Sequence, residues 1–113
     1  MERFQAGRAT LIATLTAPLP ACGEETAAVD WLEVRADVLG DQDVAPLREA
    51  FPGRLLYTLR SRAEGGAFEG SAERRKRRLL DAAGRYDLVD LEMARDLVPE
   101  VLKAVPPERR VLS

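Results

Sequence analysis

Charged and hydroxyl side chains recur at every second position within apolar runs of this sequence, where a buried parallel strand would normally be apolar throughout. The set is Thr14 and Thr16; Glu33, Arg35 and Asp37; Thr58 and Arg60; and Asp90 and Glu92. Residues two apart along a strand point to the same face, so each run directs its polar set to one side. Buried charges are costly unless they are paired or used. Two arginines among carboxylates suit a small substrate that bears carboxylate and hydroxyl groups.

The same residues allow a purely structural interpretation. Glu33–Arg35 and Arg60–Glu92 could be ion pairs that fill the centre of the fold, since such networks also occur away from functional sites. For any single pair both interpretations stay open, whereas the whole set favours a polar ligand site.

A loop after the third apolar run carries Glu64, followed by Gly65 and Gly66. Two consecutive glycines allow a loop to fold tightly over a neighbouring site. Glu64 could there orient a base or accept a hydrogen bond, although the same residues also suit a plain flexible loop.

Five apolar runs, expected to be strands, must position these side chains: residues 10–16, 31–35, 54–60, 87–92 and the start of a fifth at 111–113. Between them the sequence predicts helices over residues 23–29, 44–51, 72–83 and about 94–105. Asp43 and Ser71 precede two of these helices as N-cap residues. Short strands that alternate with helices are typical of parallel βαβ units.

This order predicts an α/β fold of the (β/α)8 TIM-barrel type, with residues 1–113 forming about the first half: four βα units plus the start of a fifth strand. A whole barrel needs about 250 residues, and its active site lies at the carboxyl ends of the strands, where the polar residues fall. A complete, small, doubly wound sheet is the alternative. Because the chain stops within a strand-like run, we expect a piece of a larger protein. Its open sheet edges predict a homo-oligomer.

Composition excludes several kinds of site. The 113 residues include no histidine and one cysteine, so this chain alone provides no histidine acid–base or metal site and no disulfide framework. No apolar run approaches the roughly 18 to 20 residues of a membrane span, and the first residues lack a signal pattern. We therefore expect a soluble, cytoplasmic protein with no metal and no membrane contact. The net charge of -2 argues against general nucleic-acid binding.

The run from Glu73 to Arg78 contains five consecutive basic residues and is the feature that could favour nucleic acid. It lies in the predicted helix 72–83, where consecutive residues wrap around the axis and do not form one stripe. A solvated helix face is the favoured interpretation. A nucleic-acid-binding domain remains the less favoured alternative.

Three segments together resemble the type I 3-dehydroquinate dehydratases: residues 32–37 (Leu-Glu-Val-Arg-Ala-Asp), 58–66 (Thr-Leu-Arg-Ser-Arg-Ala-Glu-Gly-Gly) and 89–92 (Val-Asp-Leu-Glu). The resemblance extends from Thr10 to Ser113, and the second segment is the most specific. It implies a (β/α)8 barrel of the shikimate pathway that dehydrates 3-dehydroquinate to 3-dehydroshikimate. In this family a lysine forms a Schiff base with the ketone and a histidine moves the proton, without a metal or diffusible cofactor.

The resemblance also implies roles for individual residues. Glu33 and Arg35 would hold substrate hydroxyls, and Arg60 would bind near the hydroxyl and carboxylate end of the substrate. Thr14 stands near the place of a substrate-contacting serine of the family, a loose match. Glu64 would orient the catalytic histidine.

Asp90 and Glu92 would line the lumen below the site, with no role assigned by the resemblance. The family histidine follows the fifth strand and the lysine lies on the sixth, but this chain has no histidine, and its lysines, Lys76 and Lys103, fall on predicted helices. We therefore expect the 113-residue chain to be inactive by itself. Some relatives carry a fused shikimate dehydrogenase domain. The alternative function is a non-enzymatic α/β domain for self-assembly or regulation.

Overall fold

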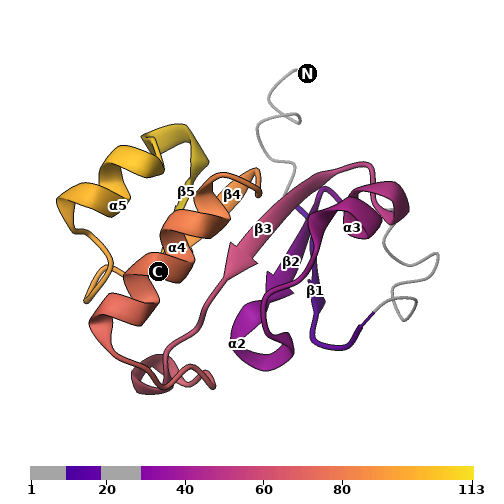
Figure 1. Ribbon diagram of the computed structural model, residues 1–113. Coiled ribbons are helices and arrows are strands. Elements are labelled where there is room, and N and C mark those ends of the chain that lie inside the picture. Colours follow the sequence, from indigo (N-terminus) through magenta and orange to yellow (C-terminus); the bar gives the residue numbers. More distant parts are fainter. Residues whose placement is uncertain (1–9, 19–28) are drawn as a thin grey trace.

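Five parallel strands organise the computed structural model, which describes residues 10–18 and 29–113. The strands are β1 (Ile12–Leu15), β2 (Trp31–Arg35), β3 (Arg54–Thr58), β4 (Leu88–Leu91) and β5 (Arg110–Leu112). Each strand neighbours the one that precedes it, in the order β1-β2-β3-β4-β5 (Figure 1). A doubly wound sheet reverses its order at a switch point. The consecutive order excludes that alternative for the described strands and confirms the α/β architecture of the barrel type.

Helices connect the strands, in part where the sequence predicts them, and the first of the described helices lies at residues 36–39, where no helix was predicted. They are α2 (Ala36–Leu39), α3 (Val44–Ala50), α4 (Ala72–Ala83) and α5 (Pro99–Ala104), with short 3-10 turns η2 (Arg62–Glu64) and η3 (Pro107–Arg109). The carboxylate of Asp43 accepts the N–H of Ala45, and the hydroxyl of Ser71 accepts the N–H of Arg74. Both predicted N-caps are therefore present. The helix predicted over residues 23–29 lies outside the described residues.

Several predicted boundaries are wrong. β3 ends at Thr58 and not at residue 60, and β4 spans Leu88–Leu91 within the predicted 87–92. The last helix begins at Pro99 and not near residue 94, because proline fits the first helical turn. The loop before it is held elsewhere, since the carboxylate of Asp96 accepts the N–H of Glu92. β1 also ends before Thr16, which is exposed and lies outside the strand.

The core forms where one face of the sheet packs against the helices. The sheet contributes Leu32, Val34, Leu55, Tyr57, Val89 and Leu91, and the helical layer contributes Leu47, Phe51, Leu79, Ala82 and Val101. Helices α4 and α5 lie side by side, with α4 against β4 (Figure 1). Burial of each large apolar side chain stabilises the fold by about 1.5 to 3 kcal/mol. None of the described helices has the length and apolar character that crossing a membrane requires.

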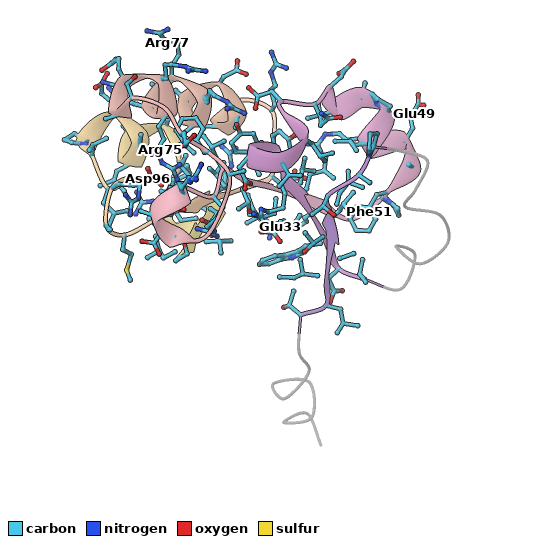
Figure 2. The ribbon with its side chains drawn as sticks, turned by 90° about the horizontal axis from the view of Figure 1, so that it is seen from below. Glu33, Glu49, Phe51, Arg75, Arg77 and Asp96 are labelled. Carbon is cyan, nitrogen blue, oxygen red and sulfur yellow. The ribbon has the colours of Figure 1, made fainter. Side chains whose placement is uncertain are left out.

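The prediction that the basic run is a solvated helix face is wrong at Arg75. Arg74 and Arg77 are exposed as expected, but Arg75 is only 5% exposed. It shares the inward face of α4 with Leu79 and Ala82, which follow at helical spacing. Figure 2 shows Arg77 pointing away from the molecule and Arg75 close to Asp96.

Candidate functional site

Glu33 is the centre of one cluster on the polar face of the sheet. Its Oε1 accepts the hydroxyl of Thr14 at 2.9 Å, and its Oε2 accepts the hydroxyl of Thr58 at 2.6 Å. The three residues come from neighbouring strands, with Thr14 and Glu33 in register across β1 and β2. The alternation pattern predicted this shared face. The two hydroxyls fix the carboxylate of Glu33, which Figure 2 labels near the middle of the molecule.

Arg35 pairs with Asp37, so the Glu33–Arg35 pair of the structural interpretation is wrong. Nε and Nη2 of Arg35 donate to the two Asp37 oxygens at 2.9 and 2.8 Å. Asp37 lies in α2, a single turn directly after β2 that the alternation did not predict, and it also accepts the N–H of Ala67. The hydrogen bond to Asp37 raises the pKa of Arg35. Burial works to raise the pKa of Asp37, but Arg35 holds it below its usual value.

Arg60 joins the carboxyl ends of β3, β4 and β5 in a second cluster. Its Nη1 donates to Glu92 Oε2 at 2.8 Å and lies 3.0 Å from Asp90 Oδ2. The same nitrogen donates to the Ser113 hydroxyl at 2.9 Å, which in turn donates to Asp90 at 2.9 Å. Both carboxylate side chains are nearly inaccessible, at 5% and 1% exposure. The Arg60–Glu92 pair is therefore present, and Asp90 belongs to the same cluster.

The two carboxylates of this cluster are shifted in opposite directions. Burial raises the pKa of Asp90, and Arg60 offsets that rise only in part. Burial acts on Glu92 in the same way, but the Ser61 backbone N–H and Arg60 hold the pKa of Glu92 below its usual value. Burial works to lower the pKa of Arg60, but its two carboxylate partners raise it. The result is a fixed cation between a carboxylate that stays ionised and one that takes up a proton more readily.

Glu64 lies beside this cluster on η2. Its Oε2 accepts Nη2 of Arg95 at 3.0 Å, and Nε of Arg95 donates to Glu92 Oε1 at 2.7 Å. The loop folds tightly, as the two glycines predict. Gly65 has a φ of 91°, and a Cβ on Gly66 would lie 2.3 Å from the backbone oxygen of Arg60. That distance excludes any side chain at Gly66 without a shift of the backbone.

The sequence interpretation missed four residues that contact the second cluster directly: Arg75, Arg95, Asp96 and Ser113. For Arg75 a signal exists, because it lies four residues before Leu79 and seven before Ala82 on the apolar face of a helix. Arg95 and Asp96 gave none, since they fall in a segment predicted as helix. Ser113 gave none either.

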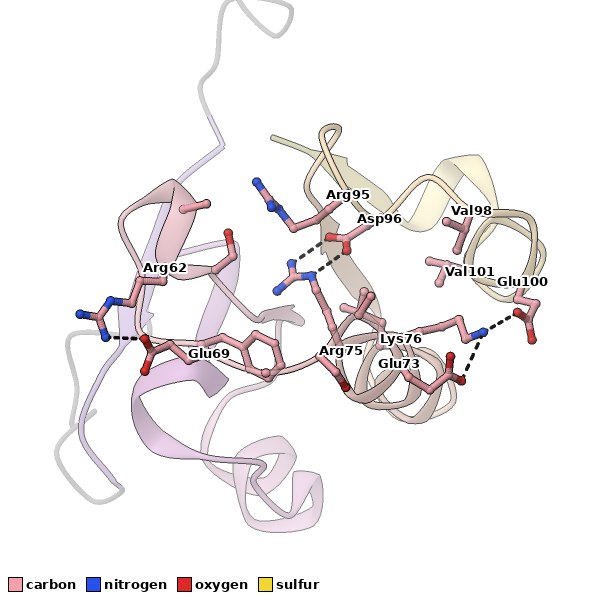
Figure 3. A pocket seen from close by; sticks show the side chains of 17 residues that line it. Arg62, Glu69, Glu73, Arg75, Lys76, Arg95, Asp96, Val98, Glu100 and Val101 are labelled. Atoms are coloured by element: carbon pink, nitrogen blue, oxygen red, sulfur yellow. Dashed lines mark hydrogen bonds and ion pairs between the residues drawn. The ribbon is translucent and has the colours of Figure 1, made fainter.

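A groove of about 740 Å³ lies between the η2 loop, the start of α4 and the chain leading into α5 (Figure 3). Its lining includes Arg95 and Asp96, which also bond to Glu92. Phe68, Leu79 and Val101 supply apolar lining. The cations at its rim are paired, Arg62 with a glutamate and Lys76 with two. The cations of the polar face, Arg35 and Arg60, are paired with carboxylates as well. No histidine, cysteine and carboxylate grouping suited to a metal ion occurs among residues 10–18 and 29–113.

Comparison with known sequences identifies relatives of this chain. Residues 12–110 match the family model described as type I 3-dehydroquinase. The 3-dehydroquinate dehydratase of Methanothrix thermoacetophila is 41% identical over 70 residues, which cover 61% of this chain and 31% of that protein. The one from Methanospirillum hungatei is 33% identical over 95 residues, 80% of this chain and 37% of that protein. The chain thus spans about a third of the length of these curated relatives.

A solved structure shares the fold. It is described as dehydroquinate dehydratase and shikimate dehydrogenase from S. pombe, and it matches 98% of this chain and 25% of its own with a TM-score of 0.69 and 22% identity. At that identity the match concerns the fold, and it agrees with consecutive parallel strands of a barrel. The family model covers nearly the whole described sheet, including both polar clusters except Ser113. The chain belongs to the type I 3-dehydroquinase family.

Proposed function

We propose that this chain supplies the substrate-binding part of a cytoplasmic lyase that converts 3-dehydroquinate to 3-dehydroshikimate in the shikimate pathway. Family membership supports the proposal. The observation that carries it is the Arg60–Asp90–Glu92 cluster on the same face as Glu33. The reaction breaks a C–H bond next to a ketone, expels the neighbouring hydroxyl as water and leaves a C=C bond. A Schiff base between the ketone and a lysine acidifies that C–H bond.

Each side chain has a proposed task that fits its surroundings. The guanidinium of Arg60, held by two carboxylates, would bind the hydroxyl and carboxylate end of the substrate. Glu33, oriented by the hydroxyls of Thr14 and Thr58, would accept hydrogen bonds from substrate hydroxyls. Arg35, fixed by its fork with a carboxylate, would donate to the same hydroxyls.

Glu64 would orient the histidine that moves the proton. This chain contains no histidine, so that residue would come from another part of the enzyme. The chain also has no suitable Schiff-base lysine in the proposed site. Lys76 lies on α4 in ion pairs with Glu73 and Glu100, and Lys103 is an exposed residue of α5. We therefore propose that the 113-residue chain alone does not turn over substrate.

Fragment complementation tests this proposal. The chain would be co-expressed with the part of the Methanospirillum hungatei protein that it does not match, and the ultraviolet absorbance of the conjugated product followed. The reconstituted complex should dehydrate 3-dehydroquinate. Arg60→Met should lower kcat/KM by about 10- to 100-fold through loss of a charged hydrogen bond, whereas Arg77→Met on the exposed side of α4 should leave it unchanged.

Borohydride trapping checks the incompleteness of the chain directly. The 113-residue chain mixed with 3-dehydroquinate should give no reduced adduct, whereas the complemented complex should be labelled on the added fragment. A covalent label on Lys76 or Lys103 would contradict the proposed division of the site. A stable complex that neither binds nor dehydrates 3-dehydroquinate would refute the dehydratase function.

Self-association of the chain is the second proposal. β1 and β5 are the outer strands of the described sheet, and exposed apolar residues lie on both: Ile12 at 46% and Leu112 at 53% exposure. Outer strands with apolar side chains favour pairing with another copy. Sedimentation at micromolar concentration should show an oligomer that Ile12→Lys and Leu112→Lys weaken. A stable, folded monomer would count against it.

A fused shikimate dehydrogenase domain in the whole protein has the precedent of the S. pombe structure, which is described as carrying both activities. We propose the same arrangement for the whole protein. The reading frame beyond codon 113 tests it, because a dehydrogenase domain would be encoded there after the remaining barrel strands.

A further inference from the structure

We propose that Arg75 and Asp96 are positioning residues: this buried pair, outside the proposed substrate-binding set, fixes Glu92 and through it Arg60. Arg75 is 5% exposed and Asp96 is 2% exposed. The inference rests on the proposed function only in that Arg60 is taken as a substrate-binding residue. The placement of Arg60 itself can be measured without substrate.

The sheet needs such a device because the ladder between β3 and β4 is short. β2 and β3 are in register from Trp31–Arg54 to Arg35–Thr58. Between β3 and β4 the described register pairs are Leu56–Leu88 and Tyr57–Val89. Arg60 and Glu92 both lie beyond that ladder, so backbone pairing does not align them.

Arg75, on α4, connects the segments that follow β3 and β4. Its Nη1 donates to the backbone oxygen of Leu59 at 2.6 Å, next to Arg60. Its Nε and Nη2 donate to the two oxygens of Asp96 at 2.7 and 2.8 Å, as Figure 3 shows. One planar guanidinium thus ties the end of β3 to the loop after β4. Lysine has the charge but not the fixed fork that these three acceptors require.

Glu92 is held in two ways, because Nη2 of Arg75 lies 3.5 Å from its Oε1 and Asp96 binds its backbone. The Oδ2 atom of Asp96 accepts the backbone N–H of Glu92 at 2.7 Å, and the backbone oxygen of Glu92 accepts the N–H of Asp96 at 2.8 Å. The Glu92 side chain then accepts the N–H of Ser61 at 3.0 Å and Nη1 of Arg60 at 2.8 Å. The chain of contacts from Arg75 to Arg60 is therefore continuous and almost entirely buried.

The test measures the position of Arg60 through the titration of Asp90, followed by carboxyl ¹³C NMR in the 113-residue chain. The charged and polar groups that face Asp90 are Arg60, Glu92 and Ser113. Arg60 lowers the pKa of Asp90, so Arg60→Met should raise that pKa and defines the full effect. Asp96→Asn should reproduce most of this rise, because Glu92 moves and takes Arg60 with it.

The sign of the shift separates positioning from simple electrostatics. Loss of the negative charge at Asp96, with Arg60 in place, would lower the pKa of Asp90. A rise therefore requires that Arg60, or Glu92 or Ser113 beside it, has moved, and the rise in Arg60→Met gives the size expected when Arg60 is lost. Lys76→Met, one residue from Arg75 on the same helix, removes an ion pair to α5 and should leave the titration of Asp90 unchanged.

Two results would overturn the proposal. One is an Asp90 titration in Asp96→Asn that is unchanged or shifted downward. The other is failure of both Asp96→Asn and Arg75→Lys to fold while Lys76→Met folds, which would assign the pair to stability alone. If only Asp96→Asn fails to fold, the pKa of Asp90 is expected to rise in Arg75→Lys instead. None of these readouts involves 3-dehydroquinate, so failure here and failure of the dehydratase proposal are distinguishable.

Discussion

Replacement of Arg75 by methionine tests how much the buried ion pair stabilises the fold. The substitution leaves the Asp96 carboxylate, 2% exposed, without its bidentate partner and leaves the backbone oxygen of Leu59 without a donor. Removal of one member of a buried pair costs about 3 to 5 kcal/mol. A domain of this size has a free energy of unfolding of about 5 to 15 kcal/mol. The substitution should therefore remove a large part of the total.

Urea denaturation followed by circular dichroism measures this loss. With a slope of about 1.5 kcal/mol per molar urea, a loss of 4 kcal/mol lowers the unfolding midpoint by about 2.7 M. Lys76→Met is the matched control, because its pair with Glu100 is exposed to solvent, and the midpoint should stay within error.

The double variant Arg75→Met/Asp96→Leu sharpens the test. It removes the orphaned charge, although it also removes the acceptor of the Glu92 N–H, so it should recover part of the stability that Arg75→Met loses. A loss in Arg75→Met no greater than in Lys76→Met would refute the reasoning, because Asp96 would then have found water or another cation. A double variant that unfolds at a lower urea concentration than Arg75→Met would also contradict the reasoning.

Three further expectations follow from local contacts. Gly66→Ala places a Cβ 2.3 Å from a backbone oxygen and should cost about 1 to 3 kcal/mol in urea denaturation, whereas Gly84→Ala, with its nearest contact at 3.7 Å, should be close to neutral. Tyr86→Phe removes a buried hydroxyl with no hydrogen-bond partner among the described residues and should be neutral or stabilising, whereas Tyr57→Phe loses a 2.7 Å bond to a carboxylate and should cost about 1.5 to 3 kcal/mol. The pKa of Asp37 is lowered in the fold, so the unfolded state binds more protons in acid. The contribution of Asp37 to the free energy of unfolding is therefore fully present above the unfolded pKa of 3.8 and is lost as the pH falls through the lower folded pKa. Asp37→Asn should therefore flatten the acid limb of stability against pH, and an unchanged slope would contradict the pairing.

The alternation of polar and apolar residues determined much of the site in advance. Because side chains two apart share a face of a strand, the sequence alone predicted that Thr14, Glu33 and Thr58 lie on one side of the sheet. The same argument predicted the meeting of Arg60 and Glu92. The parallel sheet and two helix N-caps also followed from local patterns, because strands that alternate with helices form parallel βαβ units. The consecutive strand order, which excludes a doubly wound sheet for the described strands, came from the structure.

Only the tertiary structure decided which charges pair. Arg35 pairs with Asp37 because the single helical turn α2, directly after β2, places that carboxylate beside the guanidinium. Strand periodicity does not predict this turn. Arg75 and Asp96 are 21 residues apart, and only the packing of α4 against β4 brings them together. Periodicity reports which face a side chain takes within its own element. The partner it finds depends on contacts between elements, and there the free energy of burying a charge selects the pairing.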